Sequence, residues 1–310
     1  ENMPAALTVE YGSTIEQPTE IPTAEHVLFH YRDEAHPLYL DQHFRALENC
    51  GVIETWLDVR NEEEGPVRLT RMDSFAVDLP TLADEYHVLH LSGQYGGEAQ
   101  LFENDLQRGE TLTIGSSSGI QGSFESNAGL MVSVGRAADE TSGNVFGGVL
   151  CWSGIWRISA SRTAIDALSL RAGVENRFGA YVLDAGKSIT LPVFAFTWSN
   201  RGKGQISRNI HRWARDWRLP AGHKERPVLL NSWEGSYFSF TEKTLTDMMD
   251  GVREMGGEMF VVDDGWFGTG KYARDNIHKD TVGLGDWVAN PEESMLGRMA
   301  RNCPAASGPL

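Results

Sequence analysis

The stretch Val261-Val262-Asp263-Asp264-Gly265-Trp266-Phe267-Gly268 joins an apolar strand pattern to two adjacent carboxylates, two aromatic rings and two glycines. An earlier apolar run, Pro227-Val228-Leu229-Leu230-Asn231-Ser232-Trp233, is typical of a strand buried on both faces in a parallel sheet. A helix is predicted between them, over residues 241–255. Residues 227–266 therefore form one β-α-β unit, the repeat from which parallel barrels and doubly wound sheets are built.

The helix of this unit is predicted from its ends and from one apolar face. Thr241 is a candidate N-cap, and Glu242 lies in the first turn, where the helix dipole favours an acidic residue. Gly256-Gly257 ends the helix. The predicted apolar face consists of Leu245, Met248, Met249, Val252 and Met255.

The chain upstream has a different pattern, with short runs of β-forming residues from about residue 5 to residue 200. One run, Val52–Val59, leads into the polar stretch Asn61–Gly65 and predicts a strand followed by a turn. Many short strands with turn residues between them favour an antiparallel sandwich. The other predicted strands are 67–79, 86–91, 111–114, 130–134, 145–152, 155–159 and 189–198.

A helix is predicted where the two patterns meet. In Ser207–Trp217 the residues Ile210, Trp213, Ala214 and Trp217 recur at helical spacing and form one apolar stripe. We interpret this segment as a linker helix. The predicted parts are thus a sandwich domain over 1–204, a linker helix over 205–226 and the start of a barrel domain over 227–310.

Composition excludes several classes of protein. The 310 residues carry a net charge of −16, which disfavours nucleic acid and anionic membranes and makes a neutral substrate the simpler expectation. No run reaches the roughly 18 apolar residues that a membrane span requires. Cys50, Cys151 and Cys303 are too few for a disulfide framework, which favours a reducing compartment, and we expect a cytoplasmic protein.

The candidate site lies where the two predicted barrel strands end, because active sites of parallel barrels form at that edge. Asp263 and Asp264 end one strand, followed by Trp266, and Trp233 ends the other. Carboxylates accept hydrogen bonds from sugar hydroxyls, and aromatic rings cover the apolar face of a pyranose. Taken alone, the two aspartates could equally cap a turn or hold a divalent metal.

A polar and aromatic loop is predicted downstream of this edge. Asp286 and Trp287 are candidate site residues there, because loops on rigid scaffolds carry function. Arg274 and Asp275 are better explained by a local ion pair. The nine histidines lack metal-binding spacing, and neither a G-x-S-x-G frame nor a dinucleotide fingerprint is present. We therefore expect no metal and no cofactor.

Three blocks resemble glycoside hydrolase family 36, the bacterial α-galactosidases, in order and spacing. They are Asn231–Phe238, Val262–Gly268 and Leu284–Trp287. The resemblance covers roughly residues 40 to 290 and includes Leu89–Gly93. It implies a β-supersandwich, mainly antiparallel, followed by an incomplete (β/α)8 TIM barrel.

The resemblance also implies a function. It indicates a retaining α-galactosidase that releases terminal α-linked galactose from oligosaccharides, with Trp233, Asp263 and Asp264 lining the galactose subsite. The family's nucleophile and acid/base aspartates lie beyond the end of this chain, so we assign no catalytic residue and expect the fragment to be inactive alone. Family members are often tetramers, which makes a homo-oligomeric parent protein the expectation.

Two features depart from the family pattern. The pattern stops after about Glu293, which we interpret as a frameshift or a fragmentary gene, and the sandwich begins late, as if N-terminal strands were missing. Two other functions stay open. One is a transglycosidase that transfers galactose to another sugar, and the other is a non-catalytic carbohydrate-binding module.

Overall fold

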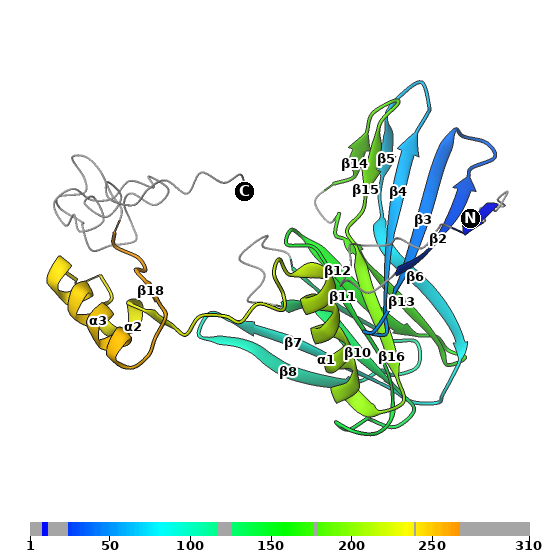
Figure 1. The fold of residues 1–310 in the computed structure, drawn as a ribbon. Helices are drawn as coiled ribbons and strands as arrows, with labels where there is room; N and C mark the ends of the chain where they lie inside the picture. The colour runs from blue at the N-terminus through cyan, green and yellow to red at the C-terminus, as the bar shows by residue number, and fades with distance from the viewer. Residues whose placement is uncertain (1–7, 12–23, 117–125, 177–178, 239, 267–310) are drawn as a thin grey trace. The chain divides into compact units, whose positions relative to one another are not determined.

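The computed structural model describes residues 8–11, 24–116, 126–176, 179–238 and 240–266. The chain divides into two compact units, Glu1–His223 and Lys224–Leu310. The first unit is built from antiparallel strands, and the described part of the second is a β-α-β arrangement (Figure 1). No helix among the described residues is long and apolar enough to cross a membrane.

Two large sheets make up the first unit (Figure 1). The larger sheet has the order β1 (Thr8–Tyr11), β2 (Ala24–Arg32), β3 (Leu38–Leu47), β4 (Val52–Asn61), β16 (Phe194–Ser199), β11 (Asn144–Leu150), β10 (Ser126–Val134), β7 (Tyr86–Gln94) and β8 (Gly97–Asp105), with β15 (Ser188–Thr190) also paired to β4. The smaller sheet has the order β6 (Met72–Thr81), β13 (Ala167–Val174), β12 (Trp156–Arg162) and β9 (Thr111–Ser116). A short pair joins β14 (Tyr181–Leu183) to β5 (Val67–Leu69). The predicted antiparallel sandwich is confirmed.

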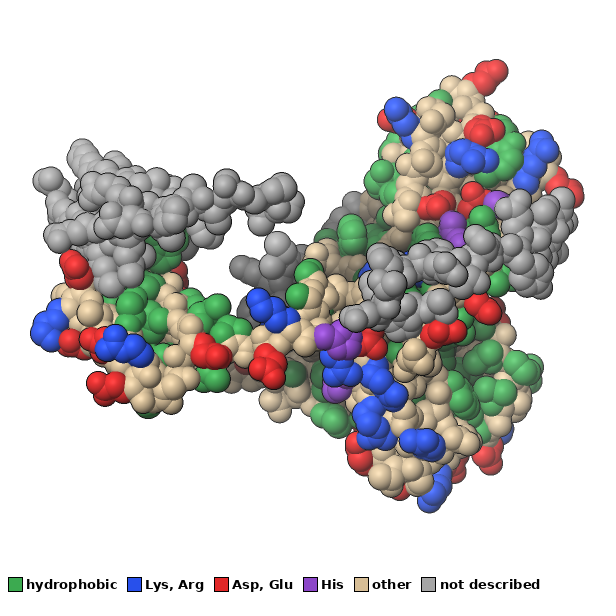
Figure 2. Space-filling view, viewed as in Figure 1, with side chains coloured by type: hydrophobic (Ala, Val, Ile, Leu, Met, Phe, Trp, Pro, Cys, Tyr) green, Lys and Arg blue, Asp and Glu red, His purple; other side chains and the backbone are tan. Residues whose placement is uncertain are grey.

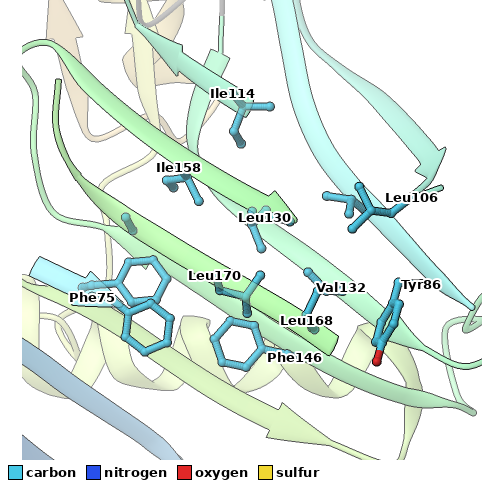
Figure 3. Packing of buried hydrophobic residues seen from close by; sticks show 14 of the residues in the cluster. Phe75, Tyr86, Leu106, Ile114, Leu130, Val132, Phe146, Ile158, Leu168 and Leu170 are labelled. Atoms are coloured by element: carbon cyan, nitrogen blue, oxygen red, sulfur yellow. The ribbon is translucent and has the colours of Figure 1, made fainter. Parts of the chain in front are cut away.

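The main core fills the space between these sheets (Figure 3). On β13, Leu168, Leu170 and Ala172 are all buried, because alternate residues of a strand point to the same face. Aromatic rings of both sheets meet there, with the Phe75 and Phe194 ring centroids 4.6 Å apart. Burial of this apolar surface is the dominant force holding the two sheets together.

Adjacent glycines on β11 let two layers approach one strand. A Cβ atom on Gly147 would lie 2.2 Å from Cγ2 of Ile206, and one on Gly148 would lie 2.2 Å from Cζ of Phe194. Successive strand residues face opposite sides of a sheet, so Gly148 meets the sandwich core and Gly147 meets the helix on the outer face. Neither position has room for a side chain.

That helix is α1 (Gly202–Trp213), which continues as a short π-helical turn, η2 (Ala214–Arg218). The predicted apolar stripe is confirmed, because Trp213 is buried in a second core with Ile210, Ala214 and Trp217 packed against it. Basic and histidine side chains lie over its outer face in Figure 2. The helix starts earlier than predicted and packs on the larger sheet as part of the first unit.

A buried acid ties this helix to the sheet. Glu54 on β4 is completely buried, and its carboxylate accepts hydrogen bonds from Nε1 of Trp213 at 2.8 Å and from Nε of Arg45 at 3.0 Å. Nε of Arg218 lies 3.8 Å from the same carboxylate. A buried charge is tolerated only when it is paired and hydrogen-bonded, which this arrangement achieves.

The second unit contains the predicted β-α-β arrangement. Its elements are β17 (Leu229–Asn231), α2 (Trp233–Ser236), α3 (Glu242–Glu254) and β18 (Met259–Val261). The two strands are parallel, with Leu229 opposite Met259 and Asn231 opposite Val261. Thr241 caps α3 as predicted, since its hydroxyl accepts the Thr244 N–H at 3.2 Å.

Four details of this unit differ from the predictions. Both strands are shorter than predicted, and Trp233 begins a helical turn instead of ending β17. Leu229 and Leu230 are 49% and 37% exposed, so β17 is not buried on both faces. Met255, predicted on the apolar face of the helix, follows the last residue of α3 and is 79% exposed. Leu245 and Val252, on the same predicted face, are buried.

Candidate functional site

The candidate site lies at the carboxyl ends of β17 and β18. Because these strands are parallel and in register, the segments that follow Asn231 and Val261 leave the sheet at the same edge. Ser232 and Trp233 leave from one strand, and Asp263 follows the other. Ser232 is completely buried, and its N–H donates to the carbonyl of Val261 at 2.9 Å, which extends the pairing by one residue.

The carboxylate of Asp263 is held from two sides. Its Oδ2 accepts a hydrogen bond from Nδ2 of Asn231 at 2.6 Å, and its Oδ1 accepts the backbone N–H of Asp264 at 2.8 Å. The backbone N–H of Asp263 donates to Oγ of Ser232 at 3.0 Å. Each carboxylate oxygen has a further lone pair that can accept a hydrogen bond. Asp263 is thus an oriented acceptor at a partly open edge.

The backbone of Trp233 is held by the same asparagine that binds this carboxylate. The Trp233 N–H donates to Oδ1 of Asn231 at 2.8 Å, so the side chain that holds Asp263 also holds the start of α2. The half-buried indole makes edge contacts with Tyr237 and Phe238, at centroid distances of 5.2 and 4.8 Å. Asn231 thus binds both the Asp263 carboxylate and the Trp233 backbone, and the predicted convergence of Trp233, Asp263 and Asp264 on one sugar stays a prediction.

A glycine turn follows the two aspartates. Gly265 has a φ of +96°, and a Cβ atom there would lie 3.1 Å from Cε1 of Phe240. Glycine is therefore suited to this position both by its backbone and by its close approach to aromatic rings. Asp264 and Trp266 flank Gly265 and are half-buried. Asp286 and Trp287, like Arg274 and Asp275, lie outside the described residues.

Asn231 and Ser232 were not among the predicted site residues. The available signal was their position at the end of an apolar run, where polar side chains of parallel strands gather. Their partners could not be deduced because the register between β17 and β18 is a tertiary property. Within the described part of the chain, no three His, Cys, Asp or Glu side chains are grouped as metal ligands.

In the sandwich, the surroundings of His26 and Cys50 shift the pKa of each side chain. Nε2 of His26 lies 3.0 Å from Nδ1 of His43, whose Nε2 lies 3.0 Å from Oδ2 of Asp58, so the three side chains link β2, β3 and β4. Burial, together with the nearby His43 and Arg45, lowers the pKa of His26. Burial raises the pKa of the free Cys50 thiol, which makes it a poor nucleophile.

Comparison with known sequences assigns the chain to a family. The sequence profile described as "Glycosyl hydrolase family 36 N-terminal domain" matches residues 3–184, which is more than half of the chain. The chain belongs to glycosyl hydrolase family 36. A second profile, "Melibiase", matches residues 188–300 of this family 36 chain and includes the candidate site. The predicted family resemblance is confirmed.

Two similar proteins are α-galactosidases. Alpha-galactosidase AgaA of Geobacillus stearothermophilus is 30% identical over 282 residues, which cover 89% of the family 36 chain and 36% of the relative. The bifunctional alpha-galactosidase/sucrose kinase AgaSK of Mediterraneibacter gnavus is 29% identical, over 85% of the chain and 26% of the relative. The chain therefore spans only about a quarter to a third of these proteins.

Solved structures agree with the fold. The galactosidase domain of AgaSK superposes with a TM-score of 0.83 at 26% identity, covering 96% of this chain and 42% of that domain. AgaA of Geobacillus stearothermophilus, solved in complex with stachyose, gives a TM-score of 0.79 at 25% identity and covers 93% of this chain. The sandwich and the partial barrel are thus confirmed as family 36 architecture.

Proposed function

We propose that this chain is the sandwich and the first part of the catalytic barrel of a retaining α-galactosidase, which releases terminal α-linked galactose from oligosaccharides. The observation that carries the proposal is the oriented carboxylate of Asp263 at the carboxyl edge of parallel strands, where Asn231 binds both this carboxylate and the Trp233 backbone. Active sites of parallel barrels form at that edge. The solved complexes of AgaA with stachyose and raffinose support an α-galactoside as the substrate.

Asp263 and Asp264 have the chemistry of a galactose subsite. Two neighbouring carboxylates can accept hydrogen bonds from the axial 4-hydroxyl and the 6-hydroxyl, while an indole covers the apolar face of the ring. A site built on such hydrogen bonds discriminates strongly against a sugar that cannot make them. Glucose, which differs from galactose at the 4-hydroxyl, is therefore expected to bind weakly.

Bond cleavage requires residues other than this pair. A retaining glycosidase places a nucleophile and an acid/base carboxyl group roughly 5 to 5.5 Å apart across the scissile bond. Asp263 and Asp264 are adjacent, and the backbone N–H of one binds the carboxylate of the other, so we assign them to binding. The catalytic pair is expected outside this chain.

We further propose that the protein forms a homo-oligomer and is located in the cytoplasm.

The test is to titrate the 310-residue chain with galactose and to measure the affinity from the changes in its ¹H–¹⁵N chemical shifts. We expect Asp263→Asn and Asp264→Asn each to weaken galactose binding by about tenfold to a hundredfold, because one hydrogen bond to a charged acceptor is lost. Asp250→Asn, at an exposed aspartate on α3, is the control and should leave binding unchanged. Full galactose affinity in both site variants would favour the carbohydrate-binding module instead.

A further inference from the structure

We infer that Asn231 is a positioning residue of the galactose subsite, because its side chain orients Asp263 and Trp233 at the same time. The inference rests on the proposed function. Asn231 is the last residue of β17, and its amide lies between two residues proposed to contact the sugar. It is exposed and makes no contribution to an apolar core.

The orientation of the amide follows from its partners. The carboxylate of Asp263 can only accept, so the group 2.6 Å from its Oδ2 must be the NH₂ of Asn231. The backbone N–H of Trp233 can only donate, so the group 2.8 Å away must be the amide oxygen. Asparagine satisfies both demands, whereas an ionised aspartate lacks the donor and leucine lacks both groups.

The consequence is a fixed carboxylate plane. The terminal torsion of an aspartate side chain is broad, so an unrestrained carboxylate samples many orientations. Asn231 holds Oδ2 and the Asp264 N–H holds Oδ1, which leaves the remaining lone pairs in defined directions. Binding sites lose affinity when such supporting hydrogen bonds are absent, because the ligand must then order the side chain itself.

The decisive variant is Asn231→Asp. It retains an oxygen for the Trp233 N–H but removes the donor to Asp263 and places two carboxylates against each other. Asn231→Ala removes both interactions. We expect Asn231→Asp to weaken galactose binding by at least about tenfold, the equivalent of one charge-assisted hydrogen bond. Its thermal unfolding midpoint should stay close to that of the wild-type chain, because the residue is exposed.

A double-mutant cycle separates positioning from a general structural role. Galactose affinity is measured for the 310-residue chain and for its Asn231→Asp, Asp263→Asn and double variants, because Asn231→Asp keeps the oxygen that binds the Trp233 N–H and changes only the interaction with Asp263. If Asn231 acts through Asp263, the double variant binds no more weakly than Asp263→Asn alone. If Asn231 acts independently of Asp263, the two losses multiply, and the inference is overturned.

The remaining outcomes distinguish this inference from the proposed function. Unchanged galactose affinity in both Asn231 variants, with a loss in Asp263→Asn, overturns the role of Asn231 and leaves the galactose subsite standing. Unchanged affinity in Asp263→Asn, or no galactose binding by the wild-type chain, overturns both. Glucose is the control sugar in every titration, since the positioned carboxylate is expected to bind the axial 4-hydroxyl of galactose, which glucose lacks.

Discussion

Gly147 shows how one residue controls the distance between a helix and a sheet. The residue has no side chain, and Ile206 of α1 occupies the space that a Cβ atom would need. Ile206 is 1% exposed and belongs to a buried apolar cluster with Ala138 and Val145, so moving it would disturb that packing. The interior of a protein is packed closely enough for a single added methyl group to matter.

We expect Gly147→Ala to destabilise the first unit by about 1 to 3 kcal/mol, the usual cost of overpacking a filled core. The measurement is the free energy of unfolding from urea titration. Gly65→Ala is the matched control, because nothing lies within 4 Å of the position that a Cβ atom would take there, and it should stay within about 0.5 to 1 kcal/mol of wild type. Equal stability of the two variants would contradict the packing argument.

At the scale of elements, α1 is joined to β4 by a charge instead of by apolar contacts alone. The buried carboxylate of Glu54 has Trp213 and Arg45 as direct partners, and Arg218 of η2 lies close by. The guanidinium of Arg218 also lies over the Trp213 ring, 5.5 Å from its centroid. Removing the acid would leave partly buried cationic groups without their counter-charge.

Glu54→Ala is therefore expected to lower the free energy of unfolding by about 3 to 5 kcal/mol, the range measured when one member of a buried ion pair is removed. Its control is Glu62→Ala, because the Arg60–Glu62 pair is exposed on both sides and should contribute less than about 1 kcal/mol. Urea unfolding followed by tryptophan fluorescence gives both values. A small effect at Glu54 would show that apolar contacts suffice to hold α1.

Prediction of the elements succeeded where the residue pattern was periodic. The stripe of Trp213 and its neighbours and the cap at Thr241 both behave as predicted, since each depends on residues within a few positions of one another. The named strand predictions omitted β1, β2, β3, β8, β13 and β14. Strand β8 is exposed along nearly its whole length, so the burial that produces a long apolar strand pattern does not apply to it.

At the scale of the whole molecule, the two units differ in how much apolar surface they cover. The first unit has a continuous core between its sheets. In the second, Val228, Leu229 and Met259 are 63%, 49% and 44% exposed, and β17 pairs only with β18 among the described strands. A two-stranded sheet with exposed apolar residues favours association with other chains.

We accordingly expect the 310-residue chain to self-associate, as light scattering after size-exclusion chromatography would reveal. A shorter chain that ends at His223 should be monodisperse by comparison, because it lacks the exposed strands of the second unit. Leu229→Lys together with Met259→Lys should reduce association of the full chain. Recovery of the unaltered 310-residue chain as a monodisperse species with one cooperative melting transition would contradict this expectation.

The sequence by itself determined the antiparallel sandwich, the β-α-β unit and the candidate pair Asp263 and Trp233, because periodicity, caps and strand ends are written in neighbouring residues. The tertiary structure alone decided that Asn231 lies opposite Val261 and that its amide joins the two candidates. The register between strands separated by a helix depends on how their side chains pack across the sheet, and the paired residues are distant from each other in the sequence.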